Sequence, residues 1–194
     1  MTPGELQAAA RILAQGMRDN PNHLKVFGRQ TARGQRRLLR FLNWVVRYVH
    51  SNGRLLGAYA QGELVGVLGM MKPGGCRPSL RDVLSLVGTI VTSNPPTGTL
   101  RILRWLKIWG RNDPVQPHWH LGPLAVHPAF RRRGIGRRLM LKCCQDVDAD
   151  GTTAYLETDL EVNVAFYKTL GFAIVRQEDV LGVSNWFMSR PPKE

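Results

Sequence analysis

Cysteine, acidic side chains and long apolar runs are all scarce in this chain of 194 residues. Its three cysteines, Cys76, Cys143 and Cys144, follow no metal-binding spacing, so we expect no metal site and a reducing, cytoplasmic setting. No apolar run approaches the ~20 residues that cross a bilayer, and the first residues lack the basic and apolar segments of an export signal. The hydrophobic content of 43% is ordinary, and we expect one globular domain over residues 1–194.

The shortage of acidic residues leaves the chain strongly basic. Lysine and arginine number 27 against 14 aspartates and glutamates, which gives a formal net charge of +13. An acidic partner, nucleic acid or an anionic membrane surface would each attract such a chain. We favour a solvated basic surface, expect no nucleic-acid partner and rank a membrane surface below the solvated one. Composition leaves the oligomeric state open.

The most informative segment is residues 118–137, where an apolar, strand-like run reaches His127-Pro128 and a basic, glycine-containing turn leads into a helix. Gly134 and Gly136 allow backbone torsions closed to other residues and let a ligand approach closely. The free N–H groups at the start of the helix point at the same place, where the helix dipole favours an anion. This arrangement predicts a phosphate-binding loop.

The spacing of the loop excludes two familiar nucleotide-binding motifs. No third glycine follows at the position of the dinucleotide fingerprint, and no Gly-Lys-Ser/Thr follows either. The residues instead fit the pattern Arg/Gln-x-x-Gly-x-Gly/Ala as Arg131-x-x-Gly134-x-Gly136. Here the chain resembles the GNAT superfamily of acyl-CoA-dependent N-acyltransferases, in which this loop holds the pyrophosphate of coenzyme A.

A second segment, residues 153–172, strengthens the resemblance. Residues 153–158 are rich in β-formers, and a helix closed by Gly171 is expected over 163–170. Asn163 and Tyr167 lie four residues apart and therefore share one helix face. They match the family pattern Asn-x-x-x-Tyr followed by Leu-Gly-Phe. Together with the last residues of the chain, this part is similar to the puromycin N-acetyltransferase branch, which implies a small amine acceptor.

The resemblance implies a mixed α/β GNAT fold, in which helices flank a twisted central mixed sheet and two splayed parallel strands receive acetyl-CoA as co-substrate. Residues 118–126 are the candidate central strand, and Pro123, which cannot donate to a ladder, implies a bulge there. The family implies that the Leu124 amide stabilises the oxyanion and that Tyr167 reprotonates the departing thiolate. The cofactor contacts implied in this way are Leu124, Ala125, Val126, Arg131, Arg132, Arg133, Gly134, Ile135, Gly136, Arg137, Asn163 and Tyr167.

Acyl transfer also needs a group that takes a proton from the amine. His120 lies eleven residues before Arg131, where the histone-acetylating branch of the family carries a glutamate base. An imidazole with an ordinary pKa of ~6.5 suits proton transfer near neutrality. Glu157, on the neighbouring strand, is the rival, and His118 comes third. A packed strand residue without chemistry is the alternative for His120.

Apolar spacing predicts the remaining elements. Helices are expected over 6–18, ended by Asn20-Pro21, and over 35–50, followed by a hairpin of 55–60 and 63–71. Residues 78–116 are expected to form a helical insertion near the acceptor site, with helices over 80–92 and 99–109. A lid or packing role is favoured over a membrane-surface helix for this insertion. Members of the family usually have a strand before the first helix, and two explanations stay open for its absence from this sequence: a missing edge strand and a misassigned start codon.

Together these features predict an N-acetyltransferase that passes acetyl from acetyl-CoA directly to a primary amine of a small molecule, with no metal. Two alternatives stay open: a non-catalytic acyl-CoA-binding sensor or regulatory module, and acetylation of a protein or peptide amine. A third hypothesis, a nucleic-acid-binding protein, would explain the arginine cluster through phosphate contacts.

Overall fold

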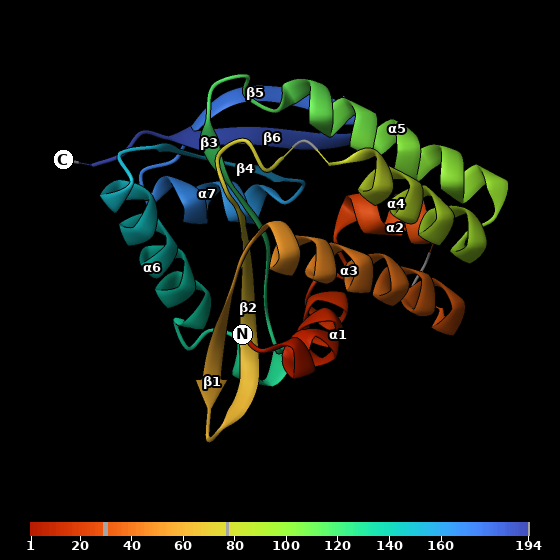
Figure 1. Cartoon of the computed structure of the whole chain (residues 1–194), viewed down its shortest axis with the longest axis horizontal. Coiled ribbons are helices and arrows are strands. Elements are labelled where there is room, and N and C mark those ends of the chain that lie inside the picture. Colours follow the sequence, from red (N-terminus) through yellow and green to blue (C-terminus); the bar gives the residue numbers. More distant parts are fainter. Residues whose placement is uncertain (29–30, 77, 194) are drawn as a thin grey trace.

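A computed structural model describes residues 1–28, 31–76 and 78–193. The strands of this described part form one sheet in the order β1-β2-β3-β4-β6-β5, in which β3 and β4 run parallel and the other neighbours are antiparallel (Figure 1). The predicted mixed α/β fold is therefore confirmed. In chain order the elements are η1 (Pro3–Glu5), α1 (Leu6–Gly16), α2 (Pro21–Phe27), α3 (Ala32–Asn52), β1 (Gly53–Ala60), β2 (Glu63–Met71), α4 (Leu80–Ser93), α5 (Pro96–Asn112), β3 (His118–Val126), η2 (Pro128–Phe130), α6 (Ile135–Ala149), β4 (Thr153–Thr158), α7 (Glu161–Lys168), β5 (Ala173–Val180) and β6 (Val183–Arg190).

The central strands of the sheet are buried on both faces, whereas most of the edge strand β5 is exposed. Apolar side chains of α1, α2, α3 and α5 form one core against it, and those of α6 and α7 form a second core. The neighbouring residues Val67 and Leu68 on β2 are both fully buried, yet they belong to different cores. This is the alternation expected of a strand that is covered on both sides. Two layers of helices thus enclose the sheet.

The bulge predicted at Pro123 is present in β3. Leu68 of β2 pairs with Leu124, whereas Met70 pairs with Leu121, so Gly69 alone stands opposite two residues of β3. A Cβ atom at Gly69 would lie 2.5 Å from the carbonyl oxygen of Gly122. The bulge therefore requires glycine on the strand facing it, because any side chain there would collide with backbone.

Beyond the bulge, β3 separates from β4. The two parallel strands pair over His118–His120 of β3 and Thr153–Tyr155 of β4. Past this point β3 continues to pair with β2 as far as Val126, and β4 continues to pair with β6 as far as Thr158. Each strand thus keeps its outer neighbour while the inner ladder stops. The splayed parallel pair that the family resemblance implies is confirmed.

The N-terminal helices differ in part from the prediction. The segment Asn20-Pro21 does not simply end a helix: α1 ends at Gly16, and Pro21 starts the additional short helix α2. Proline suits that position, since the first residue of a helix has no acceptor for its N–H. The second predicted helix is longer than expected, and as α3 it runs over Ala32–Asn52. Among the described residues the chain enters the sheet only at β1, so no strand precedes the helices.

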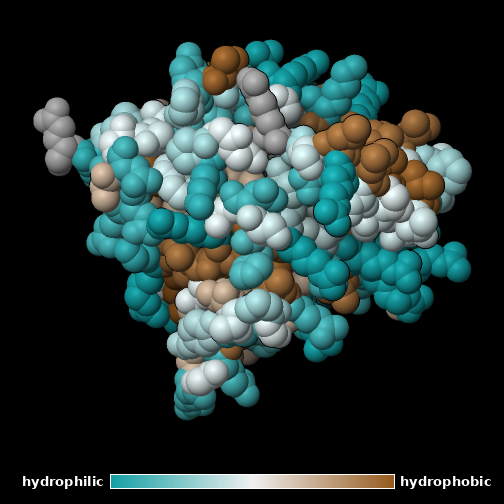
Figure 2. Space-filling view, in the orientation of Figure 1, coloured by the Kyte–Doolittle hydropathy of each residue, from teal (hydrophilic) through white to brown (hydrophobic). Residues whose placement is uncertain are grey.

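The segment 78–116 is the helical insertion that was predicted, and it consists of α4 and α5. A capping box opens α4, in which the Asp82 amide donates to Ser79 Oγ and the Asp82 carboxylate accepts from the Ser79 amide. Ile102 and Trp105 of α5 are buried in the core with the N-terminal helices. α5 thus packs against the N-terminal helices, and the lid or packing role of the whole insertion stays a prediction. Exposed leucines and valines of the two helices gather on the outer surface of the insertion (Figure 2).

No helix in the described ranges has both the length and the apolar character that a membrane span requires.

Candidate functional site

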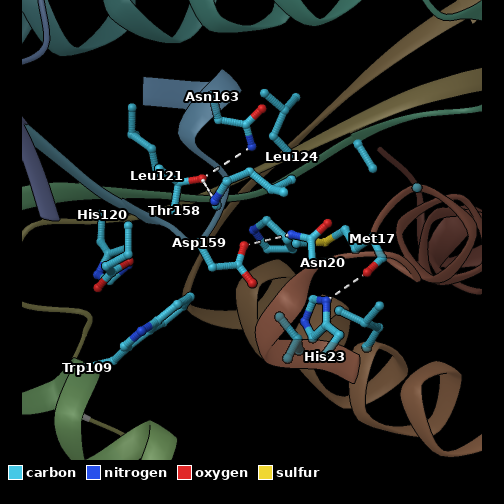
Figure 3. A pocket seen from close by; sticks show the side chains of 18 of the residues that line it. Met17, Asn20, His23, Trp109, His120, Leu121, Leu124, Thr158, Asp159 and Asn163 are labelled. Carbon is cyan, nitrogen blue, oxygen red and sulfur yellow. Dashed lines mark hydrogen bonds and ion pairs between the residues drawn. The ribbon is translucent and has the colours of Figure 1, made fainter. Parts of the chain in front are cut away.

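One cavity of about 630 Å³ lies where β3 and β4 separate (Figure 3). On one side it reaches residues of the predicted phosphate loop and of α7, including Arg131, Gly136 and Tyr167. On the other side it extends between the N-terminal helices and α5, where His23 and Trp105 line it. The predicted cofactor residues and a helical chamber thus share a single space, whose volume falls in the range of small-molecule sites.

The loop between β3 and α6 presents backbone amides to this cavity. Gly134 forms the N-cap of α6 with a φ of 74°, a left-handed conformation that disfavours a side chain. The Arg138 amide donates to the Gly134 carbonyl, so the amides of Ile135, Gly136 and Arg137 precede the first intrahelical hydrogen bond. They lie at the positive end of the helix dipole. This geometry is suited to a phosphate anion.

The arginines of the loop do not all point toward the same place. Arg131 donates from Nη2 to the carbonyl oxygen of Gly16 at the end of α1, over 2.9 Å. Arg137 donates to Thr169 Oγ1, and the Arg133 guanidinium lies over the Phe130 ring, 5.1 Å from its centroid. Arg132 is exposed. The loop is therefore fastened to α1 and to the end of α7, and direct phosphate contacts of these four side chains stay a prediction.

The backbone of β3 beyond the bulge faces the gap between the strands at alternate residues. The His127 amide donates to the carbonyl oxygen of Val65 on β2, over 2.8 Å. Because strand residues alternate in direction, Ala125 also directs its backbone toward β2, whereas Leu124 and Val126 direct theirs toward the opening. Of the three predicted backbone contacts, Leu124 and Val126 thus have the orientation that suits a ligand arm, and Ala125 pairs with β2.

Asn163 and Tyr167 both line the cavity, one turn apart on α7. Burial, aided by the charge of Asp159, raises the pKa of Tyr167 to about 12, so its phenol stays protonated near neutrality. Its ring also packs against Phe172, so a core contact and a catalytic role are compatible. Asn163 donates from Nδ2 to Thr158 Oγ1 over 3.2 Å, which ties α7 to the end of β4.

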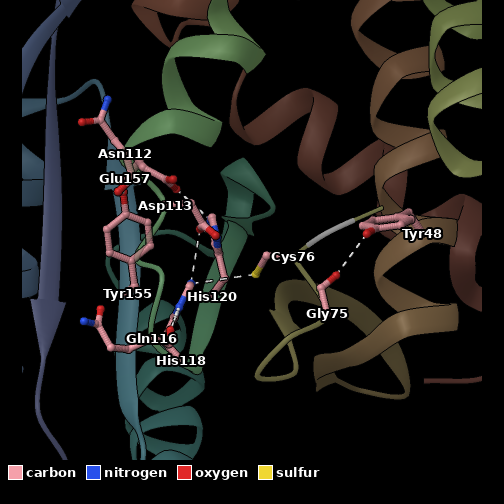
Figure 4. Close-up of polar contacts among 10 residues, drawn as sticks. All are labelled: Tyr48, Gly75, Cys76, Asn112, Asp113, Gln116, His118, His120, Tyr155 and Glu157. Atoms are coloured by element: carbon pink, nitrogen blue, oxygen red, sulfur yellow. Dashed lines mark hydrogen bonds and ion pairs between the residues drawn. The ribbon is translucent and has the colours of Figure 1, made fainter. Parts of the chain in front are cut away.

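The two predicted base candidates, His120 and Glu157, contact each other (Figure 4). His120 Nε2 lies 2.8 Å from Glu157 Oε2, and its Nδ1 lies 2.9 Å from Asp113 Oδ1. Burial opposes protonation of His120, but these carboxylates raise its pKa well above the ordinary value. Both ring nitrogens are thus engaged, and neither carries a lone pair directed at the cavity.

His118, the third candidate, lies beside them. Its Nδ1 donates to the Gln116 carbonyl over 2.8 Å, and its Nε2 lies 3.2 Å from Asp113 Oδ1. Burial opposes its protonation too, but hydrogen bonds to Asp113 and Cys76 prevail and raise the pKa of His118 to about 10. The same pair of histidines holds the pKa of Asp113 well below its usual range despite partial burial. Neither Asp113 nor Cys76 carries a sequence signal that predicts its place in this cluster.

Two further groups in the cavity were not predicted from the sequence: His23 of α2 and Asp159 at the end of β4. His23 Nδ1 donates to the Met17 carbonyl over 2.9 Å, and burial lowers the pKa of His23, so the neutral ring carries its lone pair on Nε2. Asp159 accepts hydrogen bonds from the Asn20 side chain and from the Asn22 amide (Figure 3). An imidazole and a carboxyl group thus line the helical chamber.

This combination of opened parallel strands, helix-capped phosphate loop and adjoining chamber agrees with what is known of one family. A sequence model of the acetyltransferase (GNAT) family matches residues 21–172. The chain therefore belongs to the acetyltransferase (GNAT) family, and it is an acetyltransferase whose family uses acetyl-CoA as co-substrate.

Several solved structures have the same fold. One, from Corynebacterium glutamicum, is described as histone acetyltransferase HPA2 and related acetyltransferase; it is 20% identical with a TM-score of 0.74, over 100% of this chain and 94% of that one. The ribosomal-protein-S18-alanine N-acetyltransferase of Escherichia coli is 16% identical with a TM-score of 0.56, over 100% and 92%. Ard1 of Thermoplasma volcanium is 17% identical with a TM-score of 0.59, over 100% and 95%. At such identities the likeness concerns the fold, and the puromycin N-acetyltransferase branch stays a prediction.

Proposed function

We infer that this protein transfers the acetyl group of acetyl-CoA directly to the primary amine of a small molecule. The observation that carries this inference is the continuity of the cavity, which joins the gap between β3 and β4 to the helical chamber. A thioester arm lying in the gap and an amine lying in the chamber would meet where the two spaces join. Holding two reactants together in this way removes much of the entropic barrier to their reaction.

The residues at the junction supply most of the chemistry. As the amine nitrogen bonds to the thioester carbon, negative charge develops on the carbonyl oxygen, and the Leu124 amide is directed to stabilise it. Collapse of the tetrahedral intermediate then breaks the carbon–sulfur bond. The protonated Tyr167 phenol gives its proton to the leaving thiolate. The diphosphate of the cofactor would lie on the amides of Ile135 and Gly136.

For the base, we favour His23 over the predicted pair of His120 and Glu157. The proton of the amine must pass to a lone pair, and the neutral His23 ring carries one on Nε2. His120 instead has both nitrogens directed at carboxylates. Asp159, which neutral Asn20 and Asn22 groups contact, provides the negative charge that would attract an acceptor in its ammonium form.

The apolar lining of the chamber favours a small acceptor. Its walls include Trp105, Leu106 and Trp109 of α5, which lies over the N-terminal helices. These side chains make the acceptor end largely apolar, with Asp159 as a local anion. A small amine with an apolar body matches such a space.

The cysteines of the described chain are all free thiols, which supports a reducing, cytoplasmic location.

The test is a screen for coenzyme A release from acetyl-CoA with small primary amines and with peptide N-termini as acceptors. We expect transfer to small amines. We also expect Tyr167→Phe to lower kcat, while the affinity for coenzyme A, measured by calorimetry, stays the same. Transfer to peptides alone would replace the small-molecule acceptor with a protein amine. Binding of acetyl-CoA without transfer to any amine would favour the sensor alternative.

A further inference from the structure

Four potential metal ligands from three separate segments come together at one edge of the acceptor chamber. They are Cys76 after β2, Asp113 after α5, and His118 and His120 on β3 (Figure 4). One ligand atom of each residue lies within 4.8 Å of the corresponding atoms of the other three. We propose that Cys76, Asp113, His118 and His120 bind one divalent transition-metal ion, and that zinc fits them best.

The distances within the cluster agree with a tetrahedral site. Asp113 Oδ1 lies 2.9 Å from His120 Nδ1 and 3.2 Å from His118 Nε2, and Cys76 Sγ lies 3.9 Å from His118 Nε2. Bonds of about 2.0–2.3 Å to zinc place neighbouring ligand atoms roughly 3.3–3.8 Å apart. These three separations differ from that range by at most a few tenths of an ångström. Thiolate, imidazole and carboxylate are also the ligands that zinc takes in proteins.

The outer contacts of the two histidines provide a second, independent observation. His118 donates from Nδ1 to the Gln116 carbonyl, which leaves Nε2 as its ligand atom. His120 directs Nε2 to Glu157 Oε2, which leaves Nδ1 as its ligand atom. Histidine ligands of metals characteristically donate their other N–H to a carbonyl or a carboxylate in this way. Each ring is thus oriented by an oxygen acceptor, with its free nitrogen toward the common centre.

Glu157 completes this outer shell. Its side chain is only 3% exposed, and Oε1 is buried without a hydrogen-bond partner among the described residues. A buried carboxylate is costly unless positive charge lies nearby. A divalent ion bonded to Nδ1, on the side of the His120 ring away from Glu157, would supply such charge, while the Cys76 thiolate and the Asp113 carboxylate balance the ion itself. The cluster would therefore place positive charge near a carboxylate of which one oxygen, Oε1, has no hydrogen-bond partner among the described residues.

The position of the site in the fold indicates what the ion would do. Cys76 precedes α4 and Asp113 follows α5, so the two residues flank the helical insertion, while both histidines belong to the central strand. An ion bound by all four would join the two ends of the insertion to β3. Since four protein ligands leave no open coordination position, the role is structural. It would hold α5, and with it Trp105 and Trp109, in place as a wall of the acceptor chamber.

The test uses the full chain without a histidine tag, after a chelator has removed bound metal. The protein is then titrated with Co²⁺. Coenzyme A is left out, because its thiol binds metals. We expect one equivalent to bind, with the strong visible bands of tetrahedral cobalt and a thiolate-to-cobalt charge-transfer band, and Zn²⁺ to displace it. Cys76→Ser should abolish the charge-transfer band. Cys144→Ala, which alters a cysteine buried in the other core, should retain it.

The outer shell gives a separate measurement. Glu157→Gln should keep the stoichiometry of one but weaken metal binding about 10–100-fold, as is usual when such a partner is altered. Circular dichroism checks that each variant is folded. The proposal is overturned if the unsubstituted protein binds no stoichiometric ion, or if its cobalt spectrum is octahedral. An unchanged spectrum in folded Cys76→Ser would overturn it as well, and the cluster would then be a metal-free network of ion pairs.

Discussion

Gly136 gives the sharpest test of the phosphate loop, because the fold itself does not need a glycine there. A Cβ atom at this position would have Val126 Cγ2, at 3.7 Å, as its only close neighbour, and residue 136 lies inside the first turn of α6. Alanine in a helix is favoured over glycine by about 0.5–1 kcal/mol. We therefore expect Gly136→Ala to fold normally, with a melting temperature raised by about 1–4 °C.

Binding of coenzyme A should change in the opposite direction. A methyl group at residue 136 would keep the diphosphate away from the amides at the start of α6. Hydrogen bonds to a charged group contribute about 1.5–3 kcal/mol each. Loss of one such bond corresponds to a dissociation constant about 10–100 times higher, since 1.4 kcal/mol is about tenfold. Titration calorimetry with coenzyme A measures this value, and thermal unfolding of the same sample measures stability.

Gly134→Ala is the matched control. Its φ of 74° makes alanine unfavourable by about 1–2 kcal/mol, although a Cβ atom there would meet only Arg138 Nη1, at 3.7 Å. The two neighbouring variants should thus separate the needs of the fold from those of the ligand: Gly134→Ala loses stability, whereas Gly136→Ala loses affinity. A Gly136→Ala protein that binds coenzyme A as tightly as the unsubstituted protein would refute the placement of the diphosphate on α6.

Two further predictions concern pH. Burial lowers the pKa of His23 from 6.5, so the neutral ring is lost only as pH falls below that value. His23→Gln should therefore lower kcat by about a hundredfold or more and remove the acidic limb of the pH–rate profile. A limb that persists in this variant would exclude His23 as the base. Arg190 donates to both carboxylate oxygens of Asp148 and lowers the pKa of Asp148 from 3.8. The ion pair therefore stabilises the fold fully above pH 3.8, and this stabilisation is lost as pH falls through the lowered pKa. Asp148→Asn should therefore cost about 1.5–3 kcal/mol at pH 7, and its urea midpoint should converge with that of the unsubstituted protein in acid; a constant difference would count against the ion pair.

The parts of the site that the sequence predicted well are those coded locally. The spacing of Asn163 and Tyr167 places both on one helix face whatever the rest of the chain does. Pro123 within an otherwise strand-like run signals the bulge, because proline cannot complete a ladder. Gly134 before a helix signals a turn with torsions closed to other residues. Each of these features follows from backbone geometry within a few residues, and the structure has all three.

The unpredicted residues are those that tertiary structure brings together. His23 reaches the cavity only because α2 turns back after α1, and Asp159 meets it from the far end of the chain. Asp113 and Cys76 join His118 through the return path of the insertion. Residue spacing carries no information on such encounters, since the intervening helices can be of any length. For the same reason residue spacing points to His120 through its strand position and gives no signal for a lone histidine in a short helix.

The close approach of Cys76 and Asp113 means that the polypeptide leaves the sheet for the insertion and returns to it at one place. A chimera that exchanges this segment between relatives could therefore preserve the strand register. Trp105, however, packs edge-on against His23 and also meets Phe41 of α3. A chimera would therefore need the insertion and the N-terminal helices from the same relative. Acceptor preference should accordingly evolve by coupled substitutions in two parts of the chain, the helices before the β1–β2 hairpin and the insertion after it.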